Sequence, residues 1–151
     1  MIRRILIIEP EPQIARDVFL LFHFEHGRFE QERYEPEIAA SVTEAVEQAQ
    51  AVKFHCIVMD AELPEMKCYE AIPLMKTLNE NPPIIVTAEK NNLELERKVR
   101  KQDIYYYHLR AFGLDELRLA VESIFEKSLR VRKPEITAIK PIVLKQLGQG
   151  R

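Results

Sequence analysis

Short apolar runs alternate five times along the chain with segments of helical periodicity, and this alternation limits the fold more than any other feature of the sequence. A short continuous apolar run is typical of a strand that is buried on both faces. Strands that alternate with helices are typical of a parallel sheet, because each crossover places a helix against one face of the sheet. The sequence therefore predicts an α/β fold with five parallel strands and helices on both faces.

Local signals refine the ends of the predicted elements. Ser41 and Glu44 have the spacing of a capping box at a helix N-terminus. Pro36 is typical of an edge strand because proline has no N–H for a central ladder, and Pro73 predicts that the third helix starts late or kinks. The predicted strands are residues 3–8, 34–40, 55–60, 83–87 and 104–108. The predicted helices are residues 12–25, 42–51, a stretch within 66–80, 93–101 and 115–130.

The length of 151 residues suits one domain rather than two. We predict a domain over residues 1–130, with a long exposed loop at 26–33, and a basic C-terminal tail over residues 131–151 that forms no separate domain. The apolar residues of the tail could dock it onto the domain; they are Ile136, Ile139, Val143 and Leu144. No aromatic residues interleave its charges and no helix-turn-helix pattern follows, so nucleic-acid binding is not expected.

Charge and cysteine usage indicate the compartment. The formal net charge of −2 argues against a surface built for nucleic acid or an acidic membrane. Cys56 and Cys68 do not form the pattern of a disulfide framework. The apolar run 5–8 is far shorter than the apolar region of a signal peptide, and no run approaches membrane-spanning length. We expect a cytoplasmic protein that does not contact the membrane.

The ends of the predicted strands carry the residues that could perform chemistry. In an open parallel sheet the functional site lies beyond the carboxyl ends of the strands. Here those ends supply Glu9, Asp60, Thr87 and Arg110. Asp60 closes an otherwise apolar strand, which is an unusual choice for core packing. A strand-ending aspartate also commonly caps a helix or forms a turn, and the residues alone leave both interpretations open.

Four motifs in order resemble the response-regulator receiver family, over about residues 1–128. They are Arg-Ile-Leu-Ile-Ile-Glu-Pro-Glu-Pro, Val-Met-Asp-Ala-Glu-Leu-Pro-Glu-Met, Ile-Ile-Val-Thr-Ala and Tyr-His-Leu-Arg-Ala-Phe-Gly-Leu-Asp-Glu-Leu. The resemblance implies a flavodoxin-like (CheY-like) doubly wound sheet with strand order 2-1-3-4-5. It implies that Asp60 accepts a phosphoryl group from a phosphohistidine, that Thr87 is the hydroxyl residue beside it, and that Tyr107 is the switch aromatic.

The same resemblance implies a magnesium ion in an acidic pocket, and here the sequence departs from the family. The implied metal ligands are Glu9, Asp60 and the backbone carbonyl of Glu62, but Pro10 replaces the second residue of the family's acidic pair and offers no side-chain ligand. Glu11 or Glu62 are the candidates to compensate. Arg110 stands at the lysine position, and a planar guanidinium is not equivalent to a compact ammonium ion. Ala111 follows it, so a cis peptide bond is not expected there.

Two mechanisms remain open within the family. The first is a stand-alone receiver in a two-component phosphorelay that is phosphorylated at Asp60, with a sensor histidine kinase or phosphotransfer protein as its partner. The second is a pseudo-receiver, which binds its partner or itself without phosphorylation. In either mechanism the surface formed by the fourth helix, fifth strand and fifth helix is the expected contact face and a candidate homodimer interface. Neither mechanism makes the chain a metabolic enzyme.

Other interpretations are less well supported by the sequence. A flavin- or nucleotide-binding enzyme is disfavoured because no glycine-rich loop follows the first strand, and the chain has only four glycines. His23 and His26 have helical spacing, but no third metal ligand accompanies them. His55 and His108 are interpreted as core or edge histidines with satisfied hydrogen bonds. Without the resemblance, Thr87 and Tyr107 would be ordinary strand residues.

Overall fold

The computed structural model describes residues 1–23 and 33–129, except for the side chains of residues 127–129. The predicted loop at 26–33 lies almost entirely outside the described residues, and the tail lies wholly outside them. The strands are β1 (Ile2–Ile8), β2 (Arg33–Ala39), β3 (Cys56–Asp60), β4 (Ile84–Ala88) and β5 (Tyr106–Leu109). The helices are α1 (Pro12–His23), α2 (Val42–Ala51), α3 (Cys68–Leu78), α4 (Leu93–Arg100) and α5 (Leu114–Leu129), and a short 3₁₀ helix, η1 (Arg110–Phe112), follows β5.

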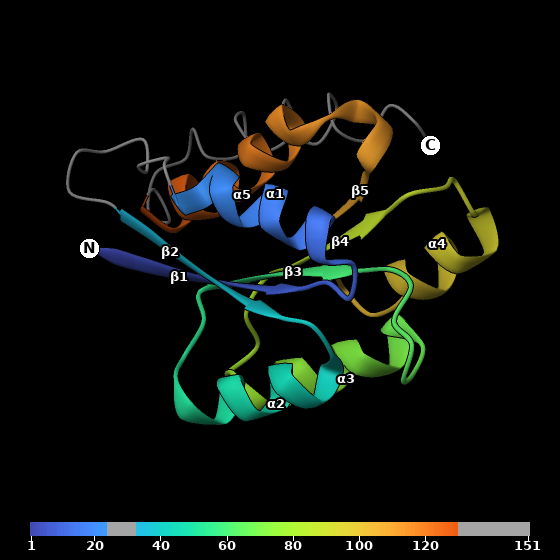
Figure 1. Ribbon diagram of the computed structural model, residues 1–151, viewed down its shortest axis with the longest axis horizontal. Coiled ribbons are helices and arrows are strands. Elements are labelled where there is room, and N and C mark those ends of the chain that lie inside the picture. The colour runs from blue at the N-terminus through green and yellow to red at the C-terminus, as the bar shows by residue number, and fades with distance from the viewer. Residues whose placement is uncertain (24–32, 130–151) are drawn as a thin grey trace.

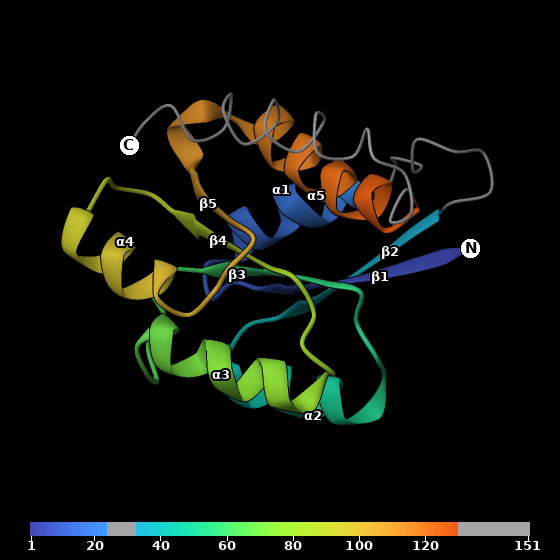
Figure 2. The same cartoon turned by 180° about the vertical axis from the view of Figure 1, so that it is seen from behind.

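The five strands form one parallel sheet in the order β2-β1-β3-β4-β5. Helices α1 and α5 lie together on one face of the sheet, and α2 and α3 lie on the other (Figure 1). The view from behind shows the same arrangement, with α4 beyond α3 on that second side (Figure 2). The predicted fold class, strand order and two-sided helix cover are therefore confirmed.

Alternate residues of the central strands point to opposite faces and build two separate cores, as the two-residue period of a strand requires. In β1, Leu6 and Ile8 pack on the α2–α3 side, whereas Ile5 and Ile7 pack on the α1–α5 side. All four side chains are essentially inaccessible to solvent. Burial on both faces explains why β1, β3 and β4 read as continuous apolar runs in the sequence.

The local signals act largely as predicted. The Ser41 hydroxyl accepts a hydrogen bond from the backbone N–H of Glu44 at 3.1 Å and caps α2, and Pro36 lies in the edge strand β2. Helix α3 begins at Cys68 and continues through Pro73 to Leu78. The prediction that the proline delays the start of this helix is therefore wrong. The helix tolerates Pro73 because α2, α4 and the sheet bury its apolar face, which outweighs one missing backbone hydrogen bond.

The described residues contain no helix with the length and apolar character needed to cross a bilayer. Both cysteines are buried and neither is in a disulfide. Burial raises the pKa of the Cys68 thiol to about 11, and it raises the pKa of Cys56 as well. Both thiols therefore act as small apolar side chains in the core.

Candidate functional site

The register of the sheet brings the predicted site residues to one edge. Asp60 at the end of β3 is the neighbour of Thr87 in β4, and Thr87 is the neighbour of His108 in β5. All three side chains are buried. Because residues in register on adjacent parallel strands point to the same face, they form a short row across three strands at the carboxyl edge.

Arg110 closes this edge by bridging two carboxylates. It is the first residue of η1, directly after β5, and its Nη2 donates to Asp60 Oδ1 at 2.5 Å and to Glu9 Oε1 at 3.2 Å. The Glu9 and Asp60 side chains are only 4% and 9% exposed, whereas that of Arg110 is 22% exposed. The structure thus places one cation between two buried carboxylates from β1 and β3.

The electrostatics of the two carboxylates follow from this burial. Desolvation raises the pKa of Glu9 to about 7, and the negative charge of Asp60 acts in the same direction. The Glu11 backbone N–H, which donates to Glu9 Oε2 at 3.1 Å, and the Arg110 guanidinium limit that rise. Desolvation also raises the pKa of Asp60, opposed first by Arg110 and then by the backbone N–H groups of Glu62 and Ala61. Arg110 offsets part of the cost of burying both carboxylates.

The donor groups at this edge fit a magnesium ion poorly. Magnesium prefers an octahedral shell of oxygen ligands, with carboxylates that are free to bind it. Here Pro10 has no ligand atom, and Arg110 already occupies one oxygen of each carboxylate. The Glu11 carboxylate accepts from the backbone N–H of Ile14 at 2.8 Å and so caps α1. The Glu62 side chain is exposed, and within the described part of the chain no three acidic, histidine or cysteine side chains cluster as metal ligands.

Comparison with known proteins agrees with this fold. The model of the response regulator receiver domain matches residues 5–122. The chain belongs to the response regulator receiver family. A comparison with curated proteins finds no significant match.

Solved receiver structures share the fold at low sequence identity. A CheY-like receiver domain protein from Methanospirillum hungatei JF-1 has a TM-score of 0.72 at 22% identity, over 85% of this chain and 98% of that one. The receiver domain of Francisella response regulator 1452 has a TM-score of 0.69 at 19% identity, over 83% and 98%. A Burkholderia pseudomallei response regulator, described with a phosphorylated aspartic acid and a calcium ion, has a TM-score of 0.67 at 18% identity, over 87% and 75%.

Tyr107 of this receiver domain is buried between the sheet and α4. Its ring is 4% exposed, and the Arg100 guanidinium lies 5.7 Å from the ring centroid. Its hydroxyl has no hydrogen-bond partner, and burial raises its pKa to about 12. Tyr105, two residues earlier, instead pairs its hydroxyl with Ser123 Oγ at 2.5 Å. The sequence resemblance places Tyr107 at the switch position, and that role stays a prediction.

The histidines of the receiver domain separate into two kinds. His55 Nδ1 accepts from the Arg4 backbone N–H at 2.9 Å, which confirms the interpretation of a satisfied histidine. His108 is 1% exposed and its Nδ1 has no partner, so the same interpretation is wrong for that atom. Its position between Thr87 and Arg110 was visible in the sequence, but the missing hydrogen bond was not. His26, the proposed companion of His23, lies outside the described residues.

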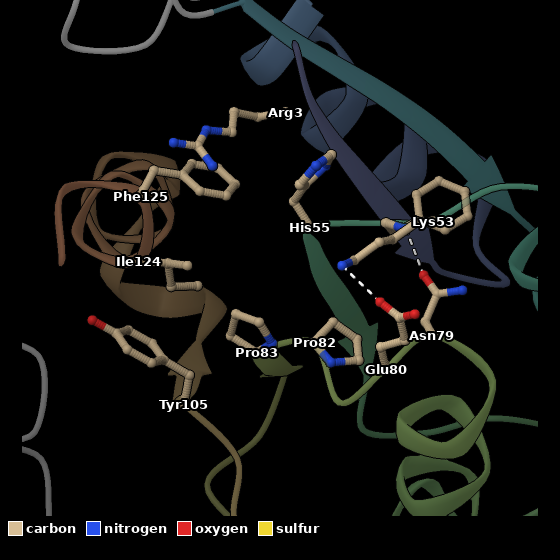
Figure 3. Close-up of a pocket in the computed structure, with 11 residues that line it drawn as sticks. Arg3, Lys53, His55, Asn79, Glu80, Pro82, Pro83, Tyr105, Ile124 and Phe125 are labelled. Carbon is tan, nitrogen blue, oxygen red and sulfur yellow. Dashed lines mark hydrogen bonds and ion pairs between the residues drawn. The ribbon is translucent and has the colours of Figure 1, made fainter. Parts of the chain in front are cut away.

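A pocket lies at the amino edge of the sheet, opposite the carboxyl edge that carries Asp60 and Arg110. It has a volume of about 400 Å³, and its walls come from β1, the segments before β3 and β4, and α5 (Figure 3). Lys53 and Glu80 form an exposed ion pair at 2.8 Å on one side. The Arg3 guanidinium lies 4.9 Å from the centroid of the Phe125 ring on the other side. None of the residues predicted to carry chemistry lines this pocket.

No peptide bond in the described ranges is cis, including the bond between Arg110 and Ala111. Ala111 and Phe112 instead continue from Arg110 as η1. The 3₁₀ turn starts at the end of β5 and directs the arginine side chain back across the ends of β3 and β1. Sequence reasoning assigned Arg110 to the lysine position but did not predict that it bonds both carboxylates.

Proposed function

We propose that this receiver domain is a pseudo-receiver, a non-enzymatic interaction module of two-component signalling that binds its partner without phosphorylation. The observation that carries the proposal is the contact of Arg110 with both Asp60 and Glu9, at 2.5 and 3.2 Å. The guanidinium supplies at this edge the positive charge that a metal ion would otherwise bring. It holds Asp60 as a structural ion pair rather than as a free nucleophile.

The chemistry of phosphoryl transfer supports this proposal. The reaction needs a carboxylate oxygen in line with the phosphorus, and cations for the charge of the equatorial oxygens. Asp60 Oδ1 is engaged by Arg110, so it is not free to attack a phosphorus atom in line. Pro10 removes the side chain that would help to hold a divalent ion. One guanidinium cannot neutralise Glu9 and a phosphorylated Asp60 together.

An exposed apolar surface supports the binding role. Leu93 on α4, Phe112 in η1 and Leu119 on α5 are 58%, 47% and 43% exposed. Leu93 and Leu119 belong to the two helices of the predicted contact face, and Phe112 lies in η1, between the fifth strand and the fifth helix. Isolated exposed apolar residues are ordinary, but several on adjoining elements are typical of a protein contact. The partner proposed for this face is a second protein of the signalling system or a second copy of the chain.

The alternative is a phosphorylated receiver, and the register of Asp60 opposite Thr87 favours it. That pair has the placement expected of a phosphoacceptor and its hydroxyl neighbour. The two candidates differ in whether Arg110 leaves Asp60 when a phosphodonor is present. Intact mass measurement after incubation with acetyl phosphate and magnesium distinguishes them.

The sharpest test restores the family pattern in the same chain. We expect no phosphoryl adduct on the wild type, and one adduct on the double variant Pro10→Asp with Arg110→Lys. Adding Asp60→Asn to the double variant is the matched control and should abolish the adduct. An adduct at Asp60 of the wild type would refute the pseudo-receiver. In a pull-down of cellular partners, Asp60→Asn alone should retain the same proteins as the wild type.

A further inference from the structure

The amino-edge pocket has the size and composition of a small-molecule site. Its volume of about 400 Å³ falls within the roughly 300–1,000 Å³ that is typical of such sites. Its wall combines apolar side chains with a small number of charged ones (Figure 3). In small-molecule sites the apolar wall holds the body of the ligand, and the few polar groups fix its orientation. The polar groups of this wall therefore indicate which ligand would fit.

Lys53 extends its ammonium group toward the centre of the pocket (Figure 3). Its Nζ pairs with Glu80 Oε2 at 2.8 Å, and no other partner of this ammonium group lies within the described residues. An ammonium group has three N–H donors, so two remain for a ligand. The Lys53 side chain is 61% exposed, which leaves these donors accessible from solvent.

His55 provides a second donor on the wall of the pocket. Its Nδ1 accepts from the Arg4 backbone N–H at 2.9 Å, so the neutral ring carries its proton on Nε2. Burial lowers the pKa of His55 and keeps the ring neutral near pH 7, and three nearby cations act in the same direction; they are Arg3, Lys53 and Arg4. In the described ranges Nε2 has no hydrogen-bond partner, and it keeps accessible surface.

The charges of the wall favour a ligand with a single negative charge. Arg3 and Lys53 are positive, and Glu80 is the one carboxylate among the described residues that line the pocket. The charges that lower the pKa of His55 are all cations, and no carboxylate opposes them. The electrostatic potential at that ring is therefore positive. A monoanion beside Lys53 and His55 compensates the one excess positive charge of the wall.

The apolar part of the wall favours a flat ring as the body of the ligand. Tyr105 lies across the pocket from Lys53, with Pro83 between them (Figure 3). Tyr105 and Pro83 are both partly exposed, so their rings offer surface to a ligand. An aromatic ligand can pack on a tyrosine ring by offset or edge contacts.

We propose that the amino-edge pocket binds an aromatic carboxylate, which accepts hydrogen bonds from Lys53 Nζ and His55 Nε2 while its ring packs on Pro83 and Tyr105. The proposal goes beyond the pseudo-receiver function and does not depend on it, because no residue of the Arg110 bridge lines this pocket. Only the folded chain forms the pocket, so the ligand stabilises the domain.

2-Naphthoate is the probe, added to the full ¹⁵N-labelled chain and followed by NMR. We expect saturable shifts of the backbone amides of Lys53, His55 and Tyr105, together with a shift of the His55 imidazole ¹⁵N resonances. 2-Naphthamide, the neutral counterpart of the same shape, should bind at least about tenfold more weakly because it lacks the charge. Absence of saturable shifts, shifts centred on another surface, or equal binding of the two probes would overturn the proposal.

Two variants of the ion pair should change the binding of 2-naphthoate in opposite directions. Lys53→Met removes the ammonium group but keeps a side chain of similar shape, and should weaken binding at least about tenfold. Glu80→Gln removes the carboxylate that competes for Lys53, and should strengthen binding by about twofold to fivefold. Both side chains are exposed, so the circular dichroism spectrum should be retained.

Lys98→Met is the matched control. Lys98 is an exposed lysine that pairs with Glu94 on α4, away from the pocket, and its substitution should leave binding unchanged. A structural role of the Lys53–Glu80 pair alone predicts the same direction of change for both of its variants. Binding that is unchanged in Lys53→Met, or weakened in Glu80→Gln, would overturn the proposal.

Discussion

At the carboxyl edge of the sheet, Glu9 and Asp60 are buried and share one cation, whereas at the amino edge Lys53 and Glu80 are exposed and pair in solvent. Glu9 and Asp60 are 4% and 9% exposed beside Arg110, but Lys53 and Glu80 are 61% and 75% exposed. The two ion pairs have similar distances. They differ in what surrounds them, and the strength of an ion pair depends on that surrounding medium more than on its length.

This difference has a topological origin. All five strands run parallel, so the residues that follow them collect at one edge and those that precede them at the other. At the carboxyl edge η1 folds Arg110 back over the strand ends, while at the amino edge Lys53 and Glu80 stand on loops that face water. The carboxyl edge should therefore respond strongly to mutation and pH, and the amino edge weakly.

Removing the shared cation should produce the largest effect. Arg110→Ala leaves Glu9 and Asp60 buried without a counter-ion, which should lower the free energy of unfolding by about 3 kcal/mol at pH 8. The loss should be smaller at pH 5, where protonation relieves the repulsion between the carboxylates. Urea denaturation at the two pH values measures it. A loss that is equal at both would mean that the guanidinium acts through packing rather than charge.

The raised pKa of Glu9 gives the carboxyl edge a pH dependence. Between the ordinary value of 4.5 and the folded value of about 7, the folded state holds more protons than the unfolded state. The free energy of unfolding should therefore fall by on the order of 3 kcal/mol as pH rises through that window. Above the window the contribution of Glu9 should no longer change with pH. Urea denaturation at several pH values from 4.5 to 8 gives the pH dependence of the free energy of unfolding, and Glu9→Gln should remove the part of that dependence that Glu9 contributes. Glu80→Gln at the amino edge is the control and should leave the slope unchanged.

Tyr107 and Tyr105 lie two residues apart in sequence, and their substitution compares the buried interior with the amino edge. Tyr107→Phe removes a buried hydroxyl without a partner and should leave stability unchanged or raise it by about 1 kcal/mol. Tyr105→Phe removes the bond to Ser123 beside the amino-edge pocket and should cost about 1 kcal/mol. Thermal unfolding of both variants gives the comparison. Opposite signs are expected, and a cost for Tyr107→Phe would reveal a partner of that hydroxyl in solution.

The smallest effect is expected at the exposed pair of the amino edge. Lys53→Ala should leave the urea midpoint unchanged within measurement error, at low salt and in high salt alike, because water already solvates both charges. A clear loss at low salt alone would show that the amino edge holds its charges more tightly than their exposure indicates.

The sequence predicted those features that depend on local pattern. The continuous apolar runs of the buried strands, Pro36 at the sheet rim and the Ser41 cap all depend on neighbouring residues, and each was confirmed. The family resemblance supplied the strand order. The course of α3 through Pro73 was harder to predict because packing against distant elements decided it.

The candidate site was predictable in its members but not in its contacts. Strand ends identified Glu9, Asp60, Thr87 and Arg110 because parallel strands finish at one edge. The bonds from Arg110 to residues 50 and 101 positions away depend on the turn that η1 makes, which no local signal specifies. The unpartnered His108 Nδ1 and the amino-edge pocket likewise arise from elements that are far apart in sequence.

Among the described residues, strand β2 pairs with β1 on one side and with no strand on the other, so it forms an edge of the sheet. Pro36 removes a donor from that edge, and Glu35 and Glu37 on either side of it would face like charges in a second copy paired in register. Strand addition between molecules is thereby discouraged at this edge, which protects the chain against amyloid-like stacking during crowded expression.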